Sequence, residues 1–60
     1  MKFIIYWLDG KSDNIEGDTI SDAFSKAGLG GGAINAVDFY DEGEVKDYEW
    51  DKYIEKWIKK

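Results

Sequence analysis

Residues 2–8, KFIIYWL, form a compact apolar run of β-branched and aromatic residues, and Asp9-Gly10 follows at once. Asp-Gly is a preferred two-residue type I′ hairpin turn, because both of its residues must adopt positive φ. Pairing outward from this turn predicts three facing pairs: Leu8 with Lys11, Tyr6 with Asp13, and Ile4 with Ile15. The run is apolar on both faces, which is typical of a central strand covered on two sides. One of those sides can be covered by another chain.

Residues 18–28, DTISDAFSKAG, predict one complete helix. Its apolar side chains recur at i, i+3, i+4 and i+7 and form a single stripe of Ile20, Ala23, Phe24 and Ala27. Asp18 or Thr19 is the expected N-cap, with Ser21 or Asp22 three residues further on. Gly28 supplies the left-handed position that follows the last turn. We expect this helix to pack on one face of the sheet.

The turn into this helix, from Glu16 to Phe24, resembles the corresponding turn of HicB-type antitoxins, which are small proteins with a ββαβ core. The resemblance is carried by Gly17-Asp18-Thr19 and is limited to that segment. It implies an antitoxin that masks a small basic toxin.

Three consecutive glycines, residues 30–32, lead to a third predicted strand over residues 33–40, and Glu42-Gly43 then predicts a turn. A two-residue loop at that turn gives three facing pairs: Tyr40 with Val45, Asp38 with Asp47, and Val37 with Tyr48. One face then carries Val37, Phe39, Tyr48 and Trp50, and the other carries Asp38, Asp47 and Glu49. Directly opposed like charges weaken a strand pair. Either the register differs, or the acidic face has a use.

The last ten residues are compatible with a helix and with a strand, and we favour the helix. A helical stripe is formed by Trp50, Tyr53, Ile54, Trp57 and Ile58. Asp47 or Asp51 can cap this helix, and Lys59-Lys60 suits its C-terminal dipole. In the alternative, a second hairpin turns between Lys52 and Lys56 and brings Trp50 towards Trp57. The predicted fold is a single α+β domain of residues 1–60, ββαββ-like, with a second helix or a further strand at its C-terminus.

The composition limits how the domain is stabilised. A chain of 60 residues supplies only roughly 3–5 kcal/mol from a single core. The absence of Cys and His removes disulfides, thiolate sites and the commonest zinc ligand. We therefore expect stability to come from packing of the aromatic residues, which make up 17% of the chain.

The charge of the chain argues against several classes of partner. All eight basic residues are Lys, the formal net charge is -5 and the sequence pI is about 4.4. Direct binding of nucleic acid usually needs Arg or a basic face, so we do not expect it. No apolar run reaches the roughly 18 residues of a membrane span, so we expect no membrane insertion and a cytoplasmic location. The charge favours a basic protein as partner.

No motif in the chain predicts a cofactor, a metal ion or catalysis. The run GLGGGA at residues 28–33 fits a dinucleotide fingerprint only in the wrong order, because it follows a helix and leads to a strand. Residues 9–16 lack the ligand spacing of a calcium loop. The serines have no His to activate them. We expect a protein without enzymatic activity.

The segment from Asp38 to Asp51 carries seven carboxylates against one lysine, interleaved with aromatic residues. We predict that this acidic aromatic surface binds a basic protein through Asp38, Asp47, Glu49, Tyr40, Asp41 and Glu44. Three alternatives remain open. The chain forms a structural homodimer, or it is an inhibitor from a phage or mobile element that mimics nucleic acid, or a HicB-like antitoxin.

Overall fold

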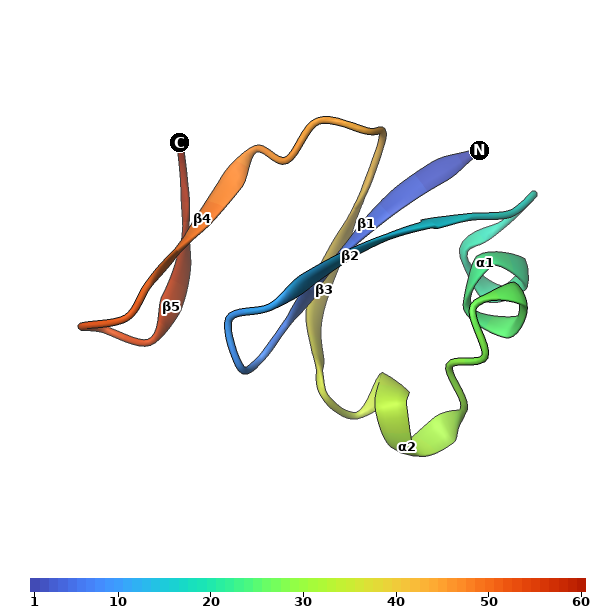
Figure 1. The fold of residues 1–60 in the computed structure, drawn as a ribbon, viewed down its shortest axis with the longest axis horizontal. Helices are drawn as coiled ribbons and strands as arrows, with labels where there is room; N and C mark the ends of the chain where they lie inside the picture. Colours follow the sequence, from blue (N-terminus) through green and yellow to red (C-terminus); the bar gives the residue numbers. More distant parts are fainter.

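A three-stranded antiparallel sheet lies between two short helices on one side and a two-stranded hairpin on the other (Figure 1). The computed structural model describes all residues, 1–60. The strand order of the sheet is β2-β1-β3, and the hairpin is β4-β5. The elements are β1 (Lys2–Trp7), β2 (Ser12–Glu16), α1 (Ile20–Lys26), α2 (Gly31–Ile34), β3 (Val37–Glu42), β4 (Tyr48–Asp51) and β5 (Lys56–Lys59). The predicted α+β class is confirmed.

Strand β1 is the centre of the molecule. Its residues 3–6 are each at most 4% exposed, and apart from Ala23 they are the whole buried apolar core. The Tyr6 ring contacts Tyr48 and Trp57, so it faces the β4-β5 hairpin. Successive side chains of a strand point to opposite faces, so Phe3 and Ile5 point to the other face of the sheet, and helix α1 lies on that side (Figure 1). The predicted central strand is confirmed, and this chain alone covers both of its faces.

The register of the first hairpin differs from the prediction by one residue. The Trp7 N–H donates to the Lys11 carbonyl over 2.8 Å, which leaves a three-residue loop of Leu8, Asp9 and Gly10. Only Gly10 in this loop has positive φ, at 91°, whereas a type I′ turn requires it at two residues. Tyr6 therefore faces Ser12, and Phe3 faces Ile15. The shift places Ile15 on the helix side of the sheet, beside Phe3.

Helix α1 forms where the sequence predicts it and is held at both ends by the predicted residues. The Asp22 N–H donates to the Thr19 hydroxyl over 3.1 Å, and the Asp22 carboxylate accepts from the Asp18 N–H over 2.9 Å. Gly28 has φ 75° and ends the helix. Ala23 is fully buried and packs so closely on Gly17 that a Cβ at position 17 would lie 2.5 Å from the Ala23 nitrogen.

The predicted pairing of the third strand is wrong. Ala33 and Ile34 belong to helix α2, and β3 begins at Val37 and pairs antiparallel with β1. Asp38 and Asp47 consequently do not face each other, so the predicted repulsion between them does not arise. Pairing with β1 satisfies the second edge of that strand and stacks Phe39 on Tyr6, with ring centroids 4.5 Å apart and planes at 16°.

The C-terminal segment is a hairpin, so the favoured helix is wrong and the alternative is right. Trp50 faces Trp57 across the strands, with centroids 5.4 Å apart in an edge-to-face arrangement. Asp51 does cap a turn, since its carboxylate accepts from the Tyr53 N–H over 2.9 Å. The turn does not continue into a helix, because Glu55 adopts a positive φ of 54° and sends the chain back as β5.

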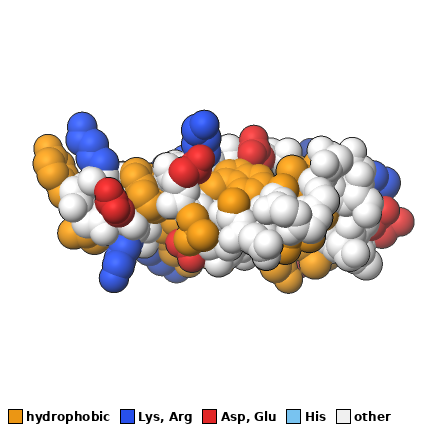
Figure 2. Space-filling model, turned by 90° about the horizontal axis from the view of Figure 1, so that it is seen from below, with side chains coloured by type: hydrophobic (Ala, Val, Ile, Leu, Met, Phe, Trp, Pro, Cys, Tyr) orange, Lys and Arg blue, Asp and Glu red, His pale blue; other side chains and the backbone are white.

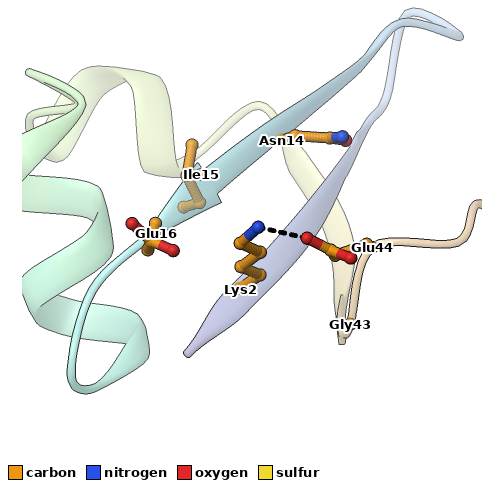
Figure 3. A pocket seen from close by; sticks show the side chains of 6 residues that line it. All are labelled: Lys2, Asn14, Ile15, Glu16, Gly43 and Glu44. Atoms are coloured by element: carbon orange, nitrogen blue, oxygen red, sulfur yellow. Dashed lines mark hydrogen bonds and ion pairs between the residues drawn. The ribbon is translucent and has the colours of Figure 1, made fainter.

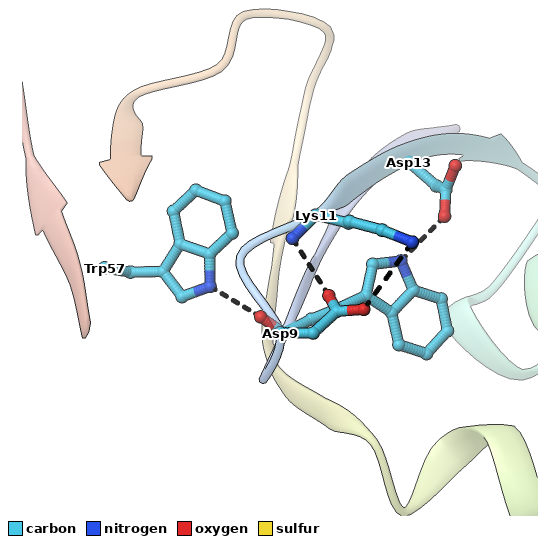
Figure 4. Close-up of polar contacts among 5 residues, drawn as sticks. Asp9, Lys11, Asp13 and Trp57 are labelled. Atoms are coloured by element: carbon cyan, nitrogen blue, oxygen red, sulfur yellow. Dashed lines mark hydrogen bonds and ion pairs between the residues drawn. The ribbon is translucent and has the colours of Figure 1, made fainter. Parts of the chain in front are cut away.

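Aromatic side chains hold the hairpin against the sheet. The Tyr6 ring meets Tyr48 and Trp57 edge-to-face at 5.2 and 4.9 Å, and the Trp57 indole N–H donates to the Trp7 carbonyl over 2.8 Å, beside the first turn (Figure 4). The buried Tyr6 hydroxyl has no hydrogen-bond partner of normal geometry, and burial raises the pKa of this phenol. The hairpin therefore rests on ring packing rather than on strand pairing.

Gly10 marks the point where the first turn touches the hairpin, because a Cβ there would lie 2.8 Å from the Trp50 ring. We predict that Gly10→Ala destabilises the protein more than Gly28→Ala, by about 1 kcal/mol or more, as expected for overpacking. Both glycines have positive φ, and Gly28 has no atom near its Cβ position, so Gly28→Ala measures the backbone cost alone. Urea unfolding followed by tryptophan fluorescence measures the difference. Equal losses would mean that the hairpin does not pack on the turn.

Candidate protein-interaction surface

Both edges of the three-stranded sheet are open. The chain extends 34 × 25 × 11 Å along its principal axes, and Figure 1 is viewed down the shortest axis, along which β2, β1 and β3 overlap. Three strands at a spacing of about 4.8 Å already span about 10 Å of this thickness. The space-filling view shows the same flat shape from below (Figure 2). Nothing in the chain therefore lies far outside β2 or β3, and both edges face solvent.

Strand β3 presents an acidic edge. Its side chains alternate between half-buried and exposed, and the exposed ones are Asp38, Tyr40 and Glu42. We call these three side chains, with the outer backbone of β3, the acidic edge. Tyr40 is 49% exposed and rests edge-to-face on Phe3, with centroids 6.2 Å apart. No basic residue occurs between Val37 and Val45.

Backbone groups on the outer side of β3 are directed away from the sheet. The Gly43 N–H donates to the Lys2 carbonyl over 2.7 Å, which fixes which β3 residues bond to β1. In the antiparallel alternation Phe39 and Asp41 bond to β1, whereas Tyr40 and Glu42 direct their N–H and C=O groups outward. The Asp41 carboxylate accepts from the Glu42 N–H over 3.0 Å. Tyr40 is thus the central residue of the edge with both polar groups directed to solvent.

The predicted site residues divide into two groups in the structure. Asp38, Tyr40 and Asp41 lie on β3 and Glu44 follows it, whereas Asp47 directly precedes β4 and Glu49 lies on β4. Asp41 is half-buried and points to the hairpin side of the sheet. The predicted face of Asp38, Asp47 and Glu49 therefore does not exist as one strand-paired surface.

Glu42 is the functional candidate that the sequence did not reveal. The sequence assigns it to a turn, because Glu42-Gly43 followed by Glu44 has the composition of a turn. In the structure it faces Phe3 as the last residue of β3. Burial alternates over residues 37–42 in the structure, but Asp41 and Glu42 are adjacent carboxylates, so no alternation in the sequence extends the strand beyond Tyr40.

Beside the end of β3, the Lys2 ammonium contacts the Glu44 carboxylate, and both side chains are more than half exposed (Figure 3). This contact lowers the pKa of Glu44 and raises the pKa of Lys2. A hollow of about 300 Å³ lies around it, lined by Lys2, Asn14, Ile15, Glu16, Gly43 and Glu44. Lys2 neutralises Glu44, whereas the three carboxylates of β3, those of Asp38, Asp41 and Glu42, have no ion-pair partner. Of these three, Asp38 and Glu42 are exposed.

The outer edge of β2 differs in charge from the acidic edge. The residues that direct their backbone groups outward there are Ser12, Asn14 and Glu16. The carboxylate of Asp13 on this strand is occupied, because it accepts from the Trp7 indole N–H over 2.7 Å. Lys11 directly precedes the strand. The two open edges are therefore similar in geometry and unequal in charge.

No protein-family model matches this chain, and no curated protein or solved structure is significantly similar to it. The resemblance to HicB-type antitoxins therefore rests on the segment from Glu16 to Phe24 alone. Neither helix has the length and apolar character needed to cross a membrane. No group of three or more acidic side chains is arranged to hold a metal ion.

We predict that Glu44→Gln returns the pKa of Lys2 towards its ordinary value, because the hydrogen bond and attraction of Glu44 raise it. Lys26 is the control, since its raised pKa depends on Asp22 and stays unchanged. NMR titration of the lysine side chains measures both. Because folding lowers the pKa of Glu44, this carboxylate stabilises the folded protein at pH values above the pKa that it has in the unfolded chain. The stabilisation is lost as the pH falls through the pKa that Glu44 has in the folded protein. An unchanged Lys2 titration would contradict the ion pair.

Proposed function

We propose that this protein is a small acidic interaction module without enzymatic activity, which docks on a basic surface of a partner protein in the cytoplasm. The observation that carries the proposal is the acidic edge: two exposed carboxylates flank an exposed tyrosine on an open strand, with no lysine between Val37 and Val45. Complementary charge steers association and selects partners, and an exposed aromatic residue provides an anchor.

The homodimer alternative has less support. It rests on the apolar first strand, but one chain covers both faces of β1, whose residues 3–6 are at most 4% exposed. Edge-to-edge contact between two copies of β3 would also oppose carboxylates to carboxylates. A toxin or a nucleic-acid-binding protein would be a basic partner, so the antitoxin and mimicry alternatives are special cases of the proposal.

Two double variants with the same charge change test the position of the surface. Asp38→Asn with Glu42→Gln neutralises the acidic edge, and Asp47→Asn with Glu49→Gln neutralises two exposed carboxylates of the hairpin segment. Immobilised protein is used to capture partners from a lysate of the source cells. We predict that the first variant retains at least tenfold less of the basic proteins bound by the unmodified chain, while the second retains them.

The captured proteins should also dissociate as salt rises, because exposed charges are screened beyond about 10 Å at 0.1 M ionic strength. Circular dichroism of both variants checks that the fold is retained. Equal capture by the unmodified chain and both variants would overturn the proposal, and so would capture of acidic proteins only.

A further inference from the structure

The outer edge of β3 has the geometry of a site for one more strand. We propose that β3 binds an extended basic segment of the partner by strand addition, centred on Tyr40; this inference rests on the proposed function. The edge is six residues long, about 20 Å, and has open space beside it. In strand addition the backbone hydrogen bonds give affinity, and alternate side chains give specificity.

The backbone pattern fixes where the added strand is centred. Tyr40 directs its N–H and C=O outward, so the facing residue of an added antiparallel strand would exchange two hydrogen bonds with it. At the next outward residue the Glu42 N–H is already bonded to the Asp41 carboxylate, which leaves only the Glu42 carbonyl free. On the other side of Tyr40 the register of β3 with β1 shifts, and Asp38 is left without a partner in β1. The regular part of the open edge is therefore centred on Tyr40.

The side chains of β3 define the sequence that fits. Directly facing residues of neighbouring strands interact, so basic residues suit the positions opposite Asp38 and Glu42. Phe39 and Tyr40 favour apolar residues opposite them. The matching segment is therefore five residues long. Its first and last residues are basic and face Glu42 and Asp38. Two adjacent apolar residues face Tyr40 and Phe39.

The same pattern rejects a second copy of this chain. An antiparallel pair of β3 strands with Tyr40 facing Tyr40 would place Asp38 against Glu42 twice, and a parallel pair would oppose identical carboxylates. Like charges directly opposed are destabilising. Unprotected edges invite aggregation, and charged edge residues are one way in which natural proteins prevent it. The acidic edge therefore disfavours pairing with the same edge of a second copy and still allows pairing with a basic strand.

Strand β2 offers the same kind of open edge without this selectivity. Two of its three outward residues, Ser12 and Asn14, are uncharged. No exposed aromatic residue lies on it, whereas β3 carries Tyr40. The amides of Ser12 and Asn14 are therefore an internal control for any test of β3.

The test uses two synthetic peptides on ¹⁵N-labelled full-length protein at low salt. The first peptide has the central sequence Lys-Thr-Val-Val-Lys, and the second is identical except that its first valine, which would face Tyr40, is N-methylated. N-methylation removes the donor for the Tyr40 carbonyl and leaves the charge unchanged. We expect the first peptide to bind at least tenfold more tightly and to protect the Tyr40 amide from hydrogen exchange, with Asn14 unaffected.

Equal binding of the two peptides would overturn strand addition and leave the charge-based proposed function standing. Protection of Asn14 in place of Tyr40 would overturn the choice of β3. If neither peptide binds, strand addition is also overturned. The proposed function is overturned as well only if the Asp38→Asn, Glu42→Gln variant captures as much of the partner proteins as the unmodified chain does.

Discussion

The structure depends on one constraint: a single strand, β1, is buried on both faces and bonded along both edges. Four of its side chains supply nearly all of the buried core. A chain of 60 residues can surround only one such strand, so β2 and β3 occupy its edges, helix α1 lies on the side of one face and the hairpin covers the other. The sheet stops after three strands, and both outer edges stay open as a direct consequence. The surface proposed for binding is therefore a result of how the core is built.

The face of β1 that carries Tyr6 is covered by the C-terminal hairpin, and aromatic side chains, not backbone pairing, hold the hairpin there. Tyr6 stacks on Phe39 and meets Tyr48 and Trp57 edge-to-face, and Trp50 packs against the first turn at Gly10. Aromatic pairs of this kind contribute about 0.5–1.5 kcal/mol each beyond the area that they bury. A hairpin of two four-residue strands has little stability of its own, so these contacts explain why ten rings occur in so short a chain.

The features that the sequence predicted correctly are determined by neighbouring residues. The apolar run of β1, the Thr19 cap and the Gly28 terminus each depend on residues within one turn or strand. The errors arose where distant segments compete. Asp9-Gly10 fits a two-residue or a three-residue loop, and the choice depends on Ile15 joining Phe3 under the helices. The capping residue Asp51 has the same chemistry in a turn as in a helix, and the pairing of Trp50 with Trp57 decides between them. At the site, the sequence predicts Asp38 and Tyr40 as binding residues from the acidic and aromatic residues that are interleaved around them. The role of Glu42 and the separation of Asp47 from β3 depend on the pairing of β3 with β1, which are more than thirty residues apart at their centres.

The sequence segment with the highest negative charge is thus divided between an open strand edge and a separate hairpin, and only the edge combines charge, an exposed ring and free backbone groups. Native-state hydrogen exchange of the isolated protein tests this account most directly. The account predicts that the amides of Phe3 to Trp7 are the most protected in the chain, while those of Tyr40 and Asn14 exchange close to the unfolded rate. Protection of Tyr40 and Asn14 equal to that of β1 would contradict it, because the edges would then already be paired.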